Sequence, residues 1–477
     1  MNTFKKKSLY AALAGVSALG VTGAAQAVNV NPDGLGQVLI YPYYTVRDKV
    51  AGAPFGTLLS VVNSTASAKA VKVRFNEGKN SREVLDFNLF LSKKDVWTAA
   101  VLPSGEGAGV GTLDKSCTVP ALPAAGALQA FVNYAYLGDP VEDESLDRTR
   151  EGYIEIIEMG TLEPGSATEI GVTHKAGVPP CTALGDTTVA SNIRAPSGGL
   201  FGGVTLINVL AGEDFTEDAV ALDFFRNTGS GVYDLPGSIK PDLSDVNPPT
   251  AVLFSGSNVY QSTPIFNNID AISALFMHEH IYNEFVLDTG TKSGTDWVLT
   301  APTKRYYYAV LSSGVAVDYL FQRNMGVDGA CDDVTITVYD REENTVTPNV
   351  SFSPPRPGKP NTLCWEANVL TFNGSQVLGS KNNRSVTVPY QNGWADLFFP
   401  VPTSGFDGFF AHYLPMNTTV TSLSGATSSG VATYFGLPII GFAVQTFNNG
   451  TLTNQAGSLV QSQYGGNFVH KGLRRIQ

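Results

Sequence analysis

The stretch Ala70–Phe75, with the sequence AVKVRF, decides the fold class. In an extended chain Val71, Val73 and Phe75 lie on one side, whereas the Lys and Arg between them lie on the other. This alternation predicts a strand of an antiparallel sheet that has one face in the core and the other face in water.

The same alternation recurs along the rest of the chain at short, even spacing. β-Branched and aromatic residues fill these segments, and clusters of Gly, Asn, Ser and Pro separate them. Many short strands divided by such turns are typical of sandwiches and barrel-like folds. We therefore predict an all-β, antiparallel β-sandwich-like architecture with further strands in residues 36–46, 57–63, 84–91, 152–158, 204–209, 284–288, 334–339, 385–388 and 433–446.

Two short segments depart from this pattern and predict helices. Phe215–Phe225 begins with Thr216 as an N-cap and places two acidic residues in its first turn, where the helix dipole favours negative charge. Asn268–His280 spaces its apolar residues at helical intervals of three and four. We expect only a few short helices beside the sheets.

The length of 477 residues exceeds the size at which a single hydrophobic core usually stops growing. We therefore predict an N-terminal β domain in residues 28–227 and a C-terminal β domain in residues 251–477. Residues 228–250 are rich in Gly and Pro and form either a linker or a long surface loop. A second Pro-rich stretch, Ser353–Asn361, lies between two cysteines and is interpreted as a loop closed by a disulfide.

Residues 1–27 have the features of a secretory signal peptide. The three lysines at positions 5–7 form its positive segment, a mildly apolar stretch follows, and Ala25-Gln26-Ala27 matches a cleavage site. The apolar stretch is shorter than the roughly 20 residues that a transmembrane helix needs. We expect the mature chain to begin near Val28, to have no transmembrane span, and to reach the periplasm, cell surface or exterior of a Gram-negative bacterium.

The four cysteines fit an oxidising compartment. Cys117, Cys181, Cys331 and Cys364 allow three pairings, and the sequence by itself does not choose among them. We favour the pairs 117–181 and 331–364, because each pair then closes a local loop. A zinc site would need close Cys or Cys/His spacing, and none of the four has such a neighbour.

Composition excludes several classes of function. The chain has 31 Lys and Arg against 42 Asp and Glu, which gives a net charge of −11. A nucleic-acid-binding surface needs clustered basic residues, so we expect no nucleic-acid partner. The chain lacks a G-x-S-x-G elbow, and its five His leave few bases for a hydrolase triad. The sequence therefore assigns no catalytic, cofactor-binding or metal-binding residue, although carboxylate pairs set only in space stay open.

Met277-His278-Glu279-His280, followed by Glu284, has the residue types of a metal site. The zincin pattern needs two His four positions apart on a helix, so that both rings share one face. Here the two His are two positions apart, which turns them to nearly opposite sides of a helix. We therefore interpret this cluster as an exposed polar helix end.

Four other patterns have simple structural interpretations. The acidic stretch Asp139–Asp147 lacks the spacing of a calcium loop and is interpreted as a solvated loop. Gly105–Gly111 lacks the context of a nucleotide-binding loop and is interpreted as a flexible loop. The run Lys304–Tyr308 is assigned to structure rather than to stacking of sugars or bases. The basic tail His470–Arg475 would contact another copy, an anionic lipid or only water.

Several segments together resemble a group of exported proteobacterial proteins that are labelled only as cell surface proteins. These segments are Asn31–Thr45, Lys69–Leu91, Thr295–Tyr308 and Tyr464–Ile476, which extend over most of the mature chain. The resemblance implies a location in the envelope or outside the cell. It transfers no site residues.

Two hypotheses for function follow. The first is an exported, non-enzymatic structural or surface protein whose partners are copies of itself or envelope components. In this hypothesis the strand at the mature N-terminus offers a free edge to a neighbouring copy. The alternative is a secreted protein that binds or hydrolyses carbohydrate through an aromatic-lined groove. The sequence leaves enzymatic activity open and favours its absence.

Overall fold

The structure is a computed structural model, and it describes residues 27–124, 126–227, 229–307, 320–321, 325–347, 362–401, 412–453 and 457–477. Strands contain 50% of the residues and helices contain 9%. The described strands pair antiparallel except for one parallel pair, and a strand lies in every range predicted above. The predicted all-β, sandwich-like fold is therefore confirmed.

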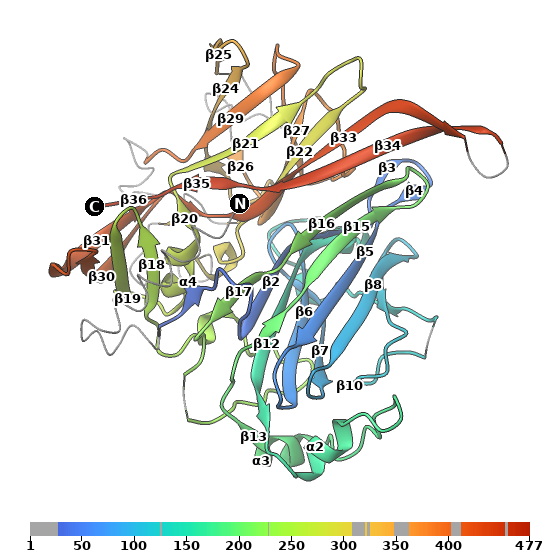
Figure 1. Cartoon of the computed structure of the whole chain (residues 1–477), viewed down its shortest axis with the longest axis vertical. Helices are drawn as coiled ribbons and strands as arrows, with labels where there is room; N and C mark the ends of the chain where they lie inside the picture. The colour runs from blue at the N-terminus through green and yellow to red at the C-terminus, as the bar shows by residue number, and fades with distance from the viewer. Residues whose placement is uncertain are drawn as a thin grey trace.

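The N-terminal half is a sandwich of two sheets (Figure 1). Sheet 1 has the order β1-β17-β2-β12-β6-β7-β10, with β13 beside β12, and sheet 2 has the order β11-β9-β8-β5-β15-β16, with β14 beside β5. The strands of sheet 1 are β1 (Asn29–Val30), β2 (Val38–Thr45), β6 (Lys69–Glu77), β7 (Glu83–Leu91), β10 (Cys117–Val119), β12 (Glu151–Leu162), β13 (Ile193–Arg194) and β17 (Val220–Asp223). Those of sheet 2 are β5 (Gly56–Asn63), β8 (Val96–Ser104), β9 (Gly107–Gly111), β11 (Gln129–Ala130), β14 (Leu200–Phe201), β15 (Gly203–Asn208) and β16 (Glu213–Asp218).

The core between these two sheets contains the apolar face predicted from the sequence. Val71, Val73 and Phe75 of β6 pack in one buried cluster with Trp97 of β8 and Val204 of β15. The opposite face of β6 was predicted to lie in water, and this prediction is wrong, because the Lys and Arg on that face are fully buried. Residues 229–250 and the 3₁₀ helix η5 (Lys304–Tyr307) contact that face.

The C-terminal half contains three five-stranded sheets. Sheet 3 consists of β18 (Ala251–Ser255), β19 (Asn258–Pro264), β30 (Tyr413–Ser422), β31 (Thr427–Phe435) and β36 (Arg475–Ile476). Sheet 4 consists of β25 (Thr345–Val346), β24 (Thr335–Asp340), β29 (Asn392–Phe398), β21 (His280–Val286) and β35 (Lys471–Leu473). Sheet 5 consists of β28 (Asn383–Val386), β27 (Ala367–Phe372), β22 (Gly294–Thr300), β33 (Ile440–Thr453) and β34 (Leu459–Val469).

The remaining elements are short. The two-stranded pairs are β3 (Asp48–Val50) with β4 (Ala53–Pro54), β20 (Met277–His278) with β32 (Leu437–Pro438), and β23 (Asp332–Asp333) with β26 (Thr362–Leu363). The α-helices of the described residues are α2 (Ala167–Val172), α3 (Asp186–Ser191) and α4 (Ile269–Phe276). The other 3₁₀ helices there are η2 (Tyr134–Tyr136), η3 (Leu146–Arg150) and η4 (Leu243–Asp245).

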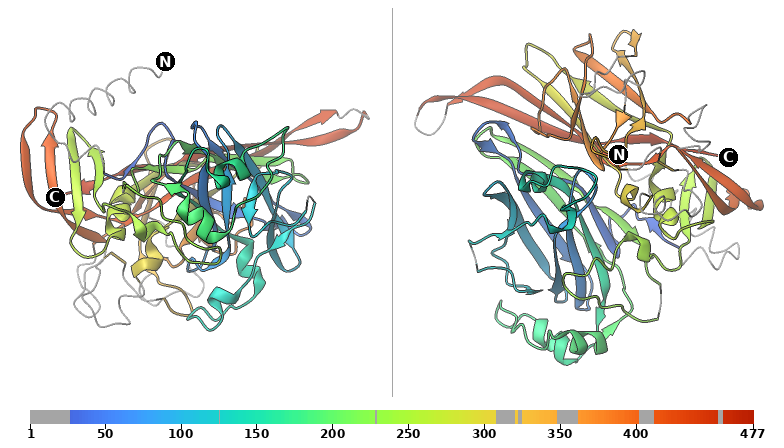
Figure 2. Two further views of the ribbon diagram at one scale, coloured as in Figure 1. Left: turned by 90° about the horizontal axis from the view of Figure 1, so that it is seen from below. Right: turned by 180° about the vertical axis from the view of Figure 1, so that it is seen from behind.

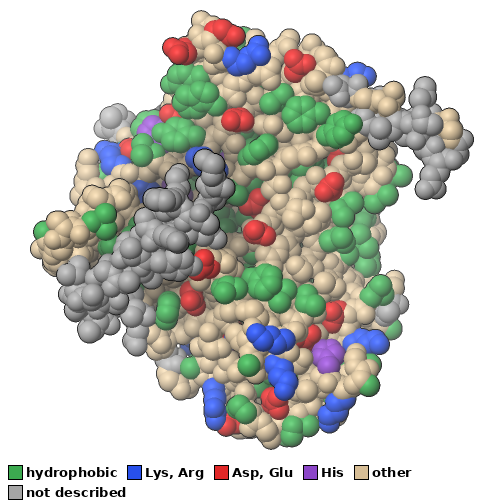
Figure 3. Space-filling view, viewed as in Figure 1, with side chains coloured by type: hydrophobic (Ala, Val, Ile, Leu, Met, Phe, Trp, Pro, Cys, Tyr) green, Lys and Arg blue, Asp and Glu red, His purple; other side chains and the backbone are tan. Residues whose placement is uncertain are grey.

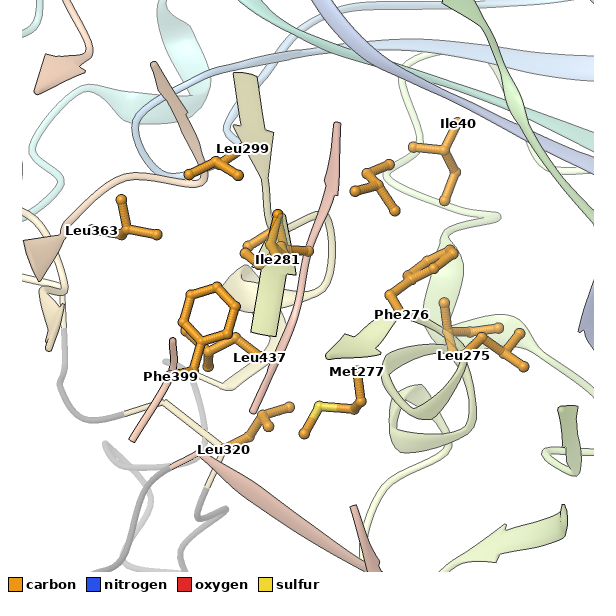
Figure 4. Close-up of a cluster of buried hydrophobic side chains, with 14 of the residues drawn as sticks. Ile40, Leu275, Phe276, Met277, Ile281, Leu299, Leu320, Leu363, Phe399 and Leu437 are labelled. Atoms are coloured by element: carbon orange, nitrogen blue, oxygen red, sulfur yellow. The ribbon is translucent and has the colours of Figure 1, made fainter. Parts of the chain in front are cut away.

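The strands of each described sheet come from one side of residues 228–250. The hydrophobic core nevertheless crosses this boundary, because Ile40 and Tyr153 belong to the same buried cluster as Phe276 and Leu437 (Figure 4). The described part of 228–250 lies along sheet 1, where the carbonyl of Leu235 accepts a hydrogen bond from Lys72 Nζ at 2.7 Å. The two halves are therefore held together by apolar and polar contacts.

The helix predicted over Asn268–His280 is confirmed in its first part, since α4 covers residues 269–276 and strands follow it. The helix predicted over Phe215–Phe225 is wrong, because this segment forms the end of β16 and all of β17. In β16 Phe215 and Glu217 are buried while their neighbours are exposed, which is the period of two that a strand requires. The acidic residues that resembled a helix start belong to the last strand of sheet 2.

Both favoured disulfides are present, Cys117–Cys181 and Cys331–Cys364. The loop Ser353–Asn361 and the leader up to residue 26 lie outside the described residues, so those two predictions stay predictions. Among the described residues, no helix is long and apolar enough to cross a membrane.

Candidate functional site

The exposed face of sheet 4 carries a row of five aromatic side chains, which we call the aromatic row. Its members are His280 and Tyr282 of β21, Trp394 and Phe398 of β29, and Tyr339 of β24. The residues that alternate with them in all three strands are buried. Period-two packing of the apolar side chains against the core therefore turns the aromatic row outward.

Register brings the rings into contact across the strands. Tyr339 lies opposite Trp394, and His280 lies opposite Phe398. The Tyr339 and Trp394 rings stack with centroids 4.3 Å apart, and the His280 and Phe398 rings stack at 4.6 Å. Tyr282 joins the two pairs, because its centroid lies 5.8 Å from that of His280 and 6.0 Å from that of Trp394. The row is thus continuous across the three strands.

Part of this row faces solvent. Trp394 is 40% exposed, and the other four rings are half-buried. Figure 3 shows hydrophobic side chains gathered over β21 and β29. Polar groups border the rings, since exposed Glu284 lies opposite Trp394 and exposed Lys471 lies opposite Tyr282. Ring faces beside hydrogen-bonding groups form a surface that suits a ligand with both apolar and polar parts.

Asp396 fixes the centre of the row. Its carboxylate lies 2.8 Å from Nδ1 of His280, and both side chains are partly buried. Burial, together with the carboxylates of Asp396 and Glu279, raises the pKa of Tyr282. The Tyr282 hydroxyl therefore keeps its proton at neutral pH and is able to donate a hydrogen bond.

The structure separates the histidine cluster that resembled a metal site. His280 and Glu284 belong to the exposed face of sheet 4, whereas His278 packs against Gly472 on the other side of the chain. Burial and the nearby charge of Arg474 lower the pKa of His278 to about 3. The predicted exposed helix end is wrong, because these residues lie in β20 and β21. Within the described residues, no group of three His, Cys, Asp or Glu side chains has the arrangement of a metal site.

The acidic stretch Asp139–Asp147 is held by basic side chains rather than solvated. Asp139 accepts a hydrogen bond from Asn80 at 2.7 Å, and Asp143 lies 2.7 Å from Nζ of Lys79. Asp147 lies 2.7 Å from Arg47. The prediction of a solvated loop is therefore wrong for these carboxylates, because side chains from two distant connecting segments, Arg47 and Lys79–Asn80, reach them.

Gly105–Gly111 also departs from its prediction, since Gly107–Gly111 forms strand β9 and is mostly buried. A side chain at Gly107 would come within 2.6 Å of Thr149, so glycine here permits close packing rather than flexibility. The run Lys304–Tyr308 has the expected structural role in its described part, where Lys304 is buried and pairs with Asp332 at 2.8 Å. Tyr308 lies outside the described residues.

The basic tail binds to its own chain. Arg474 donates hydrogen bonds to the carbonyls of Ala274, Leu275 and Met277, where α4 ends. Such donors satisfy the carbonyl groups that the last turn of a helix leaves unpaired. Arg475 lies 2.7 Å from Glu279. These two arginines are therefore engaged within the chain.

The strand predicted at the mature N-terminus has no free edge. The strand predicted there is β2, which lies inside sheet 1 between β17 and β12. The short strand β1 precedes it and pairs with β17, and Val28 forms a further bridge to Ala251.

Two cavities of the described chain bear on the candidate function. The larger, of about 470 Å³, lies on the outer face of sheet 2, and no charged residue lines it. The smaller, of about 230 Å³, is lined by Glu217, His278 and His470 together with residues of the tail. Burial raises the pKa of Glu217 to about 7 and lowers that of His470 to about 4. Neither lining contains the two facing carboxylates that glycoside hydrolysis uses.

Comparison with known proteins gives no relative, since no family model and no curated protein matches the chain. The aromatic row is therefore interpreted from its own chemistry. Sequence reasoning singled out His280 but did not identify Tyr339, Trp394 or Phe398. The alternation in Asn392–Phe398 carried a signal, because Trp394 and Phe398 both fall on the same side of that strand.

Proposed function

We propose that this chain is an exported, non-enzymatic surface protein that binds carbohydrate through the aromatic row of sheet 4. The observation that carries the proposal is the contact of five rings across three strands, with Trp394 in the most exposed position. The predicted leader and the two disulfides support export.

Carbohydrate suits this surface because a sugar ring has apolar C–H faces and a rim of hydroxyl groups. The C–H faces pack on aromatic rings, and the hydroxyl groups bond to polar side chains at the border of such a site. Glu284 and Lys471 lie at the border of the aromatic row, and Asp396 lies within it. One surface thereby offers partners for both parts of a sugar.

Preorganisation favours binding at this surface. Stacking against Tyr339 and the 2.8 Å contact between His280 Nδ1 and the Asp396 carboxylate hold the side chains in place before a ligand arrives. Immobilising a free side chain on binding costs about 0.5–1.5 kcal/mol. Rings that are already fixed avoid most of that cost, so a few stacked sugars suffice for affinity.

The protein's charge narrows the class of carbohydrate. The net charge is −11, and two carboxylates lie at the aromatic row. Like charges repel at close range, so strongly anionic polysaccharides are disfavoured as ligands. We expect neutral or amino-sugar glycans to bind best.

The test is a glycan array followed by sedimentation with insoluble polysaccharides such as cellulose and chitin. We expect the intact chain to bind at least one neutral or amino-sugar glycan, and Trp394→Ala to weaken binding at least tenfold. The matched control is Tyr134→Ala, because Tyr134 is an aromatic residue that is 76% exposed and lies in the other half of the chain. Equal losses in both variants, or no binding by the intact chain, would contradict the proposal.

A further inference from the structure

A long part of the C-terminal half contains no charged residue. From Tyr413 to Val469 the sequence has no Asp, Glu, Lys, Arg or His. This stretch forms two hairpins, β30–β31 in sheet 3 and β33–β34 in sheet 5. The two hairpins lie at opposite ends of the molecule in all three views (Figure 1, Figure 2).

Strand β31 has an open edge over most of its length. One side of the strand pairs with β30 from Thr421 to Tyr413, whereas on the other side β36 pairs only with Tyr434 and Phe435. Residues 427–431 are exposed, and among the described residues no backbone group pairs with the outer edge of 427–432. A Cβ atom added at Gly430 would meet nothing within 4 Å, so the sheet face on which that residue lies is also open there.

Several other outer strands of the described sheets are protected. The edge strand β16 contains four acidic residues, and β28 contains Arg384. Strands β1, β11 and β25 have only two residues each. The uncharged strand β34 lies across β16, where Asn467 bonds to Glu217. Charge, shortness and cover are the usual means by which native proteins prevent edge-to-edge pairing.

Strand β31 shows none of these protections at residues 427–432. It has nine residues, contains no Pro or charge, and exposes 62% of Val431. An uncovered edge of this kind is a template for another strand, because its N–H and C=O groups point outward in a fixed pattern.

We infer that the outer edge of β31, residues Thr427–Ala432, pairs antiparallel with the same edge of a second copy of this chain. The pairing joins sheet 3 of the two copies into one continuous sheet across a twofold axis. The proposal is independent of carbohydrate binding, since the aromatic row lies on sheet 4.

A second copy is the partner that the chemistry of this edge favours. Antiparallel strands related by a twofold axis present complementary donors and acceptors to each other, so an edge of this kind matches itself. Two copies that each carry a net charge of −11 repel one another over most of their surface. The uncharged hairpin around β31 offers a contact without that local repulsion.

Light scattering coupled to size-exclusion chromatography tests the proposal on the mature chain across the micromolar range. We expect a concentration-dependent dimer for the intact chain. Val431→Lys and Ser429→Lys each place two like charges near the twofold axis, so we expect each to raise the dimer dissociation constant at least tenfold. The matched control is Leu58→Lys, because Leu58 is 45% exposed but lies in β5 and is paired there with β8 on one side and β15 on the other.

A second measurement separates loss of pairing from loss of folding. Introducing one cysteine by Ser428→Cys, Ser429→Cys or Gly430→Cys is expected to give an oxidised dimer in at least one variant, because all native cysteines are already paired. Thermal unfolding of the Lys variants should match that of the intact chain. A monomer at every concentration, or a dimer that survives both Lys substitutions with no crosslink formed, would overturn the inference.

Discussion

The outer faces of sheet 1 and sheet 4 use their residues in opposite ways. On sheet 1 Lys72 and Arg74 are fully buried, and each lies within 3.1 Å of a carboxylate. On sheet 4 the aromatic row is exposed or half-buried. On these two faces, charged side chains lie between layers, whereas aromatic side chains lie at the surface.

The difference shows what each face contributes. Buried ion pairs give little net stability, because the loss of hydration offsets the attraction between the charges. They specify register, since a one-residue shift would leave a charge without its partner. The charged face of sheet 1 therefore positions the segments that cover it, and the aromatic face of sheet 4 remains available for contact.

The largest expected effect comes from breaking a buried pair on sheet 1. Lys69 Nζ lies 2.6 Å from Glu158, and both side chains are fully buried. Lys69→Met leaves the Glu158 carboxylate without its charged partner, so we expect the free energy of unfolding in urea to fall by about 3–5 kcal/mol. The control is Lys381→Met, which removes the exposed partner of Asp147 and should cost less than about 1 kcal/mol.

The same variant has a pH signature. Burial already raises the pKa of Glu158, and loss of the Lys69 charge raises it further. When folding raises the pKa of a carboxyl, the folded state loses stability as the pH rises from the pKa of the unfolded state toward that of the folded state. The loss of unfolding free energy in Lys69→Met, relative to the intact chain, should therefore shrink toward pH 4.5. A loss that stays constant from pH 4.5 to 8 would contradict this account.

The second effect concerns Glu217, which lines the cavity between the two halves. Burial raises its pKa from the ordinary value of 4.5 to about 7, so the folded state loses stability as the pH rises from 4.5 to 7. Glu217→Gln removes this penalty and should raise the free energy of unfolding above pH 7 by up to about 3 kcal/mol. Urea denaturation of both proteins at pH 4.5 and 7.5 measures this difference. An equal gain in unfolding free energy at both pH values would exclude the ionisation of Glu217 as its cause.

The smallest effect on stability is expected at the aromatic row. Trp394 is 40% exposed and contacts Tyr339 and Tyr282, so Trp394→Ala should lower the free energy of unfolding by about 1 kcal/mol. Its loss of glycan binding should be larger, at least tenfold. A loss of stability beyond about 3 kcal/mol would show that Trp394 belongs to the core and would remove the contrast between the two faces.

Much of the fold could be predicted from local pattern. The strands in the 57–63 and 84–91 ranges follow from alternation, and the two disulfides match the favoured pairing of nearest cysteines. The helix predicted at Phe215–Phe225 failed, because acids in a first helical turn and acids on an edge strand leave the same local signal. Packing against neighbouring strands decides whether such a segment forms a helix or a strand, and those strands are far away in the sequence.

The candidate site was less predictable. His280 was noted for the wrong reason, and Trp394 was not noted, because their contact depends on the register of β21 against β29. The charges on β6 were expected in water for a similar reason. Nothing near Lys72 or Arg74 in the sequence indicates that residues 229–250 and η5 cover them.

The amino-acid sequence by itself determined the class of this protein: alternating strands, few helices, two favoured cystine links and an acidic composition. Those features depend on neighbouring residues or on composition, so short windows suffice to find them. Only the tertiary structure decided which faces are covered, which rings meet and which strand edge stays open. The reason is physical, because burial and strand register arise from contacts between segments hundreds of residues apart.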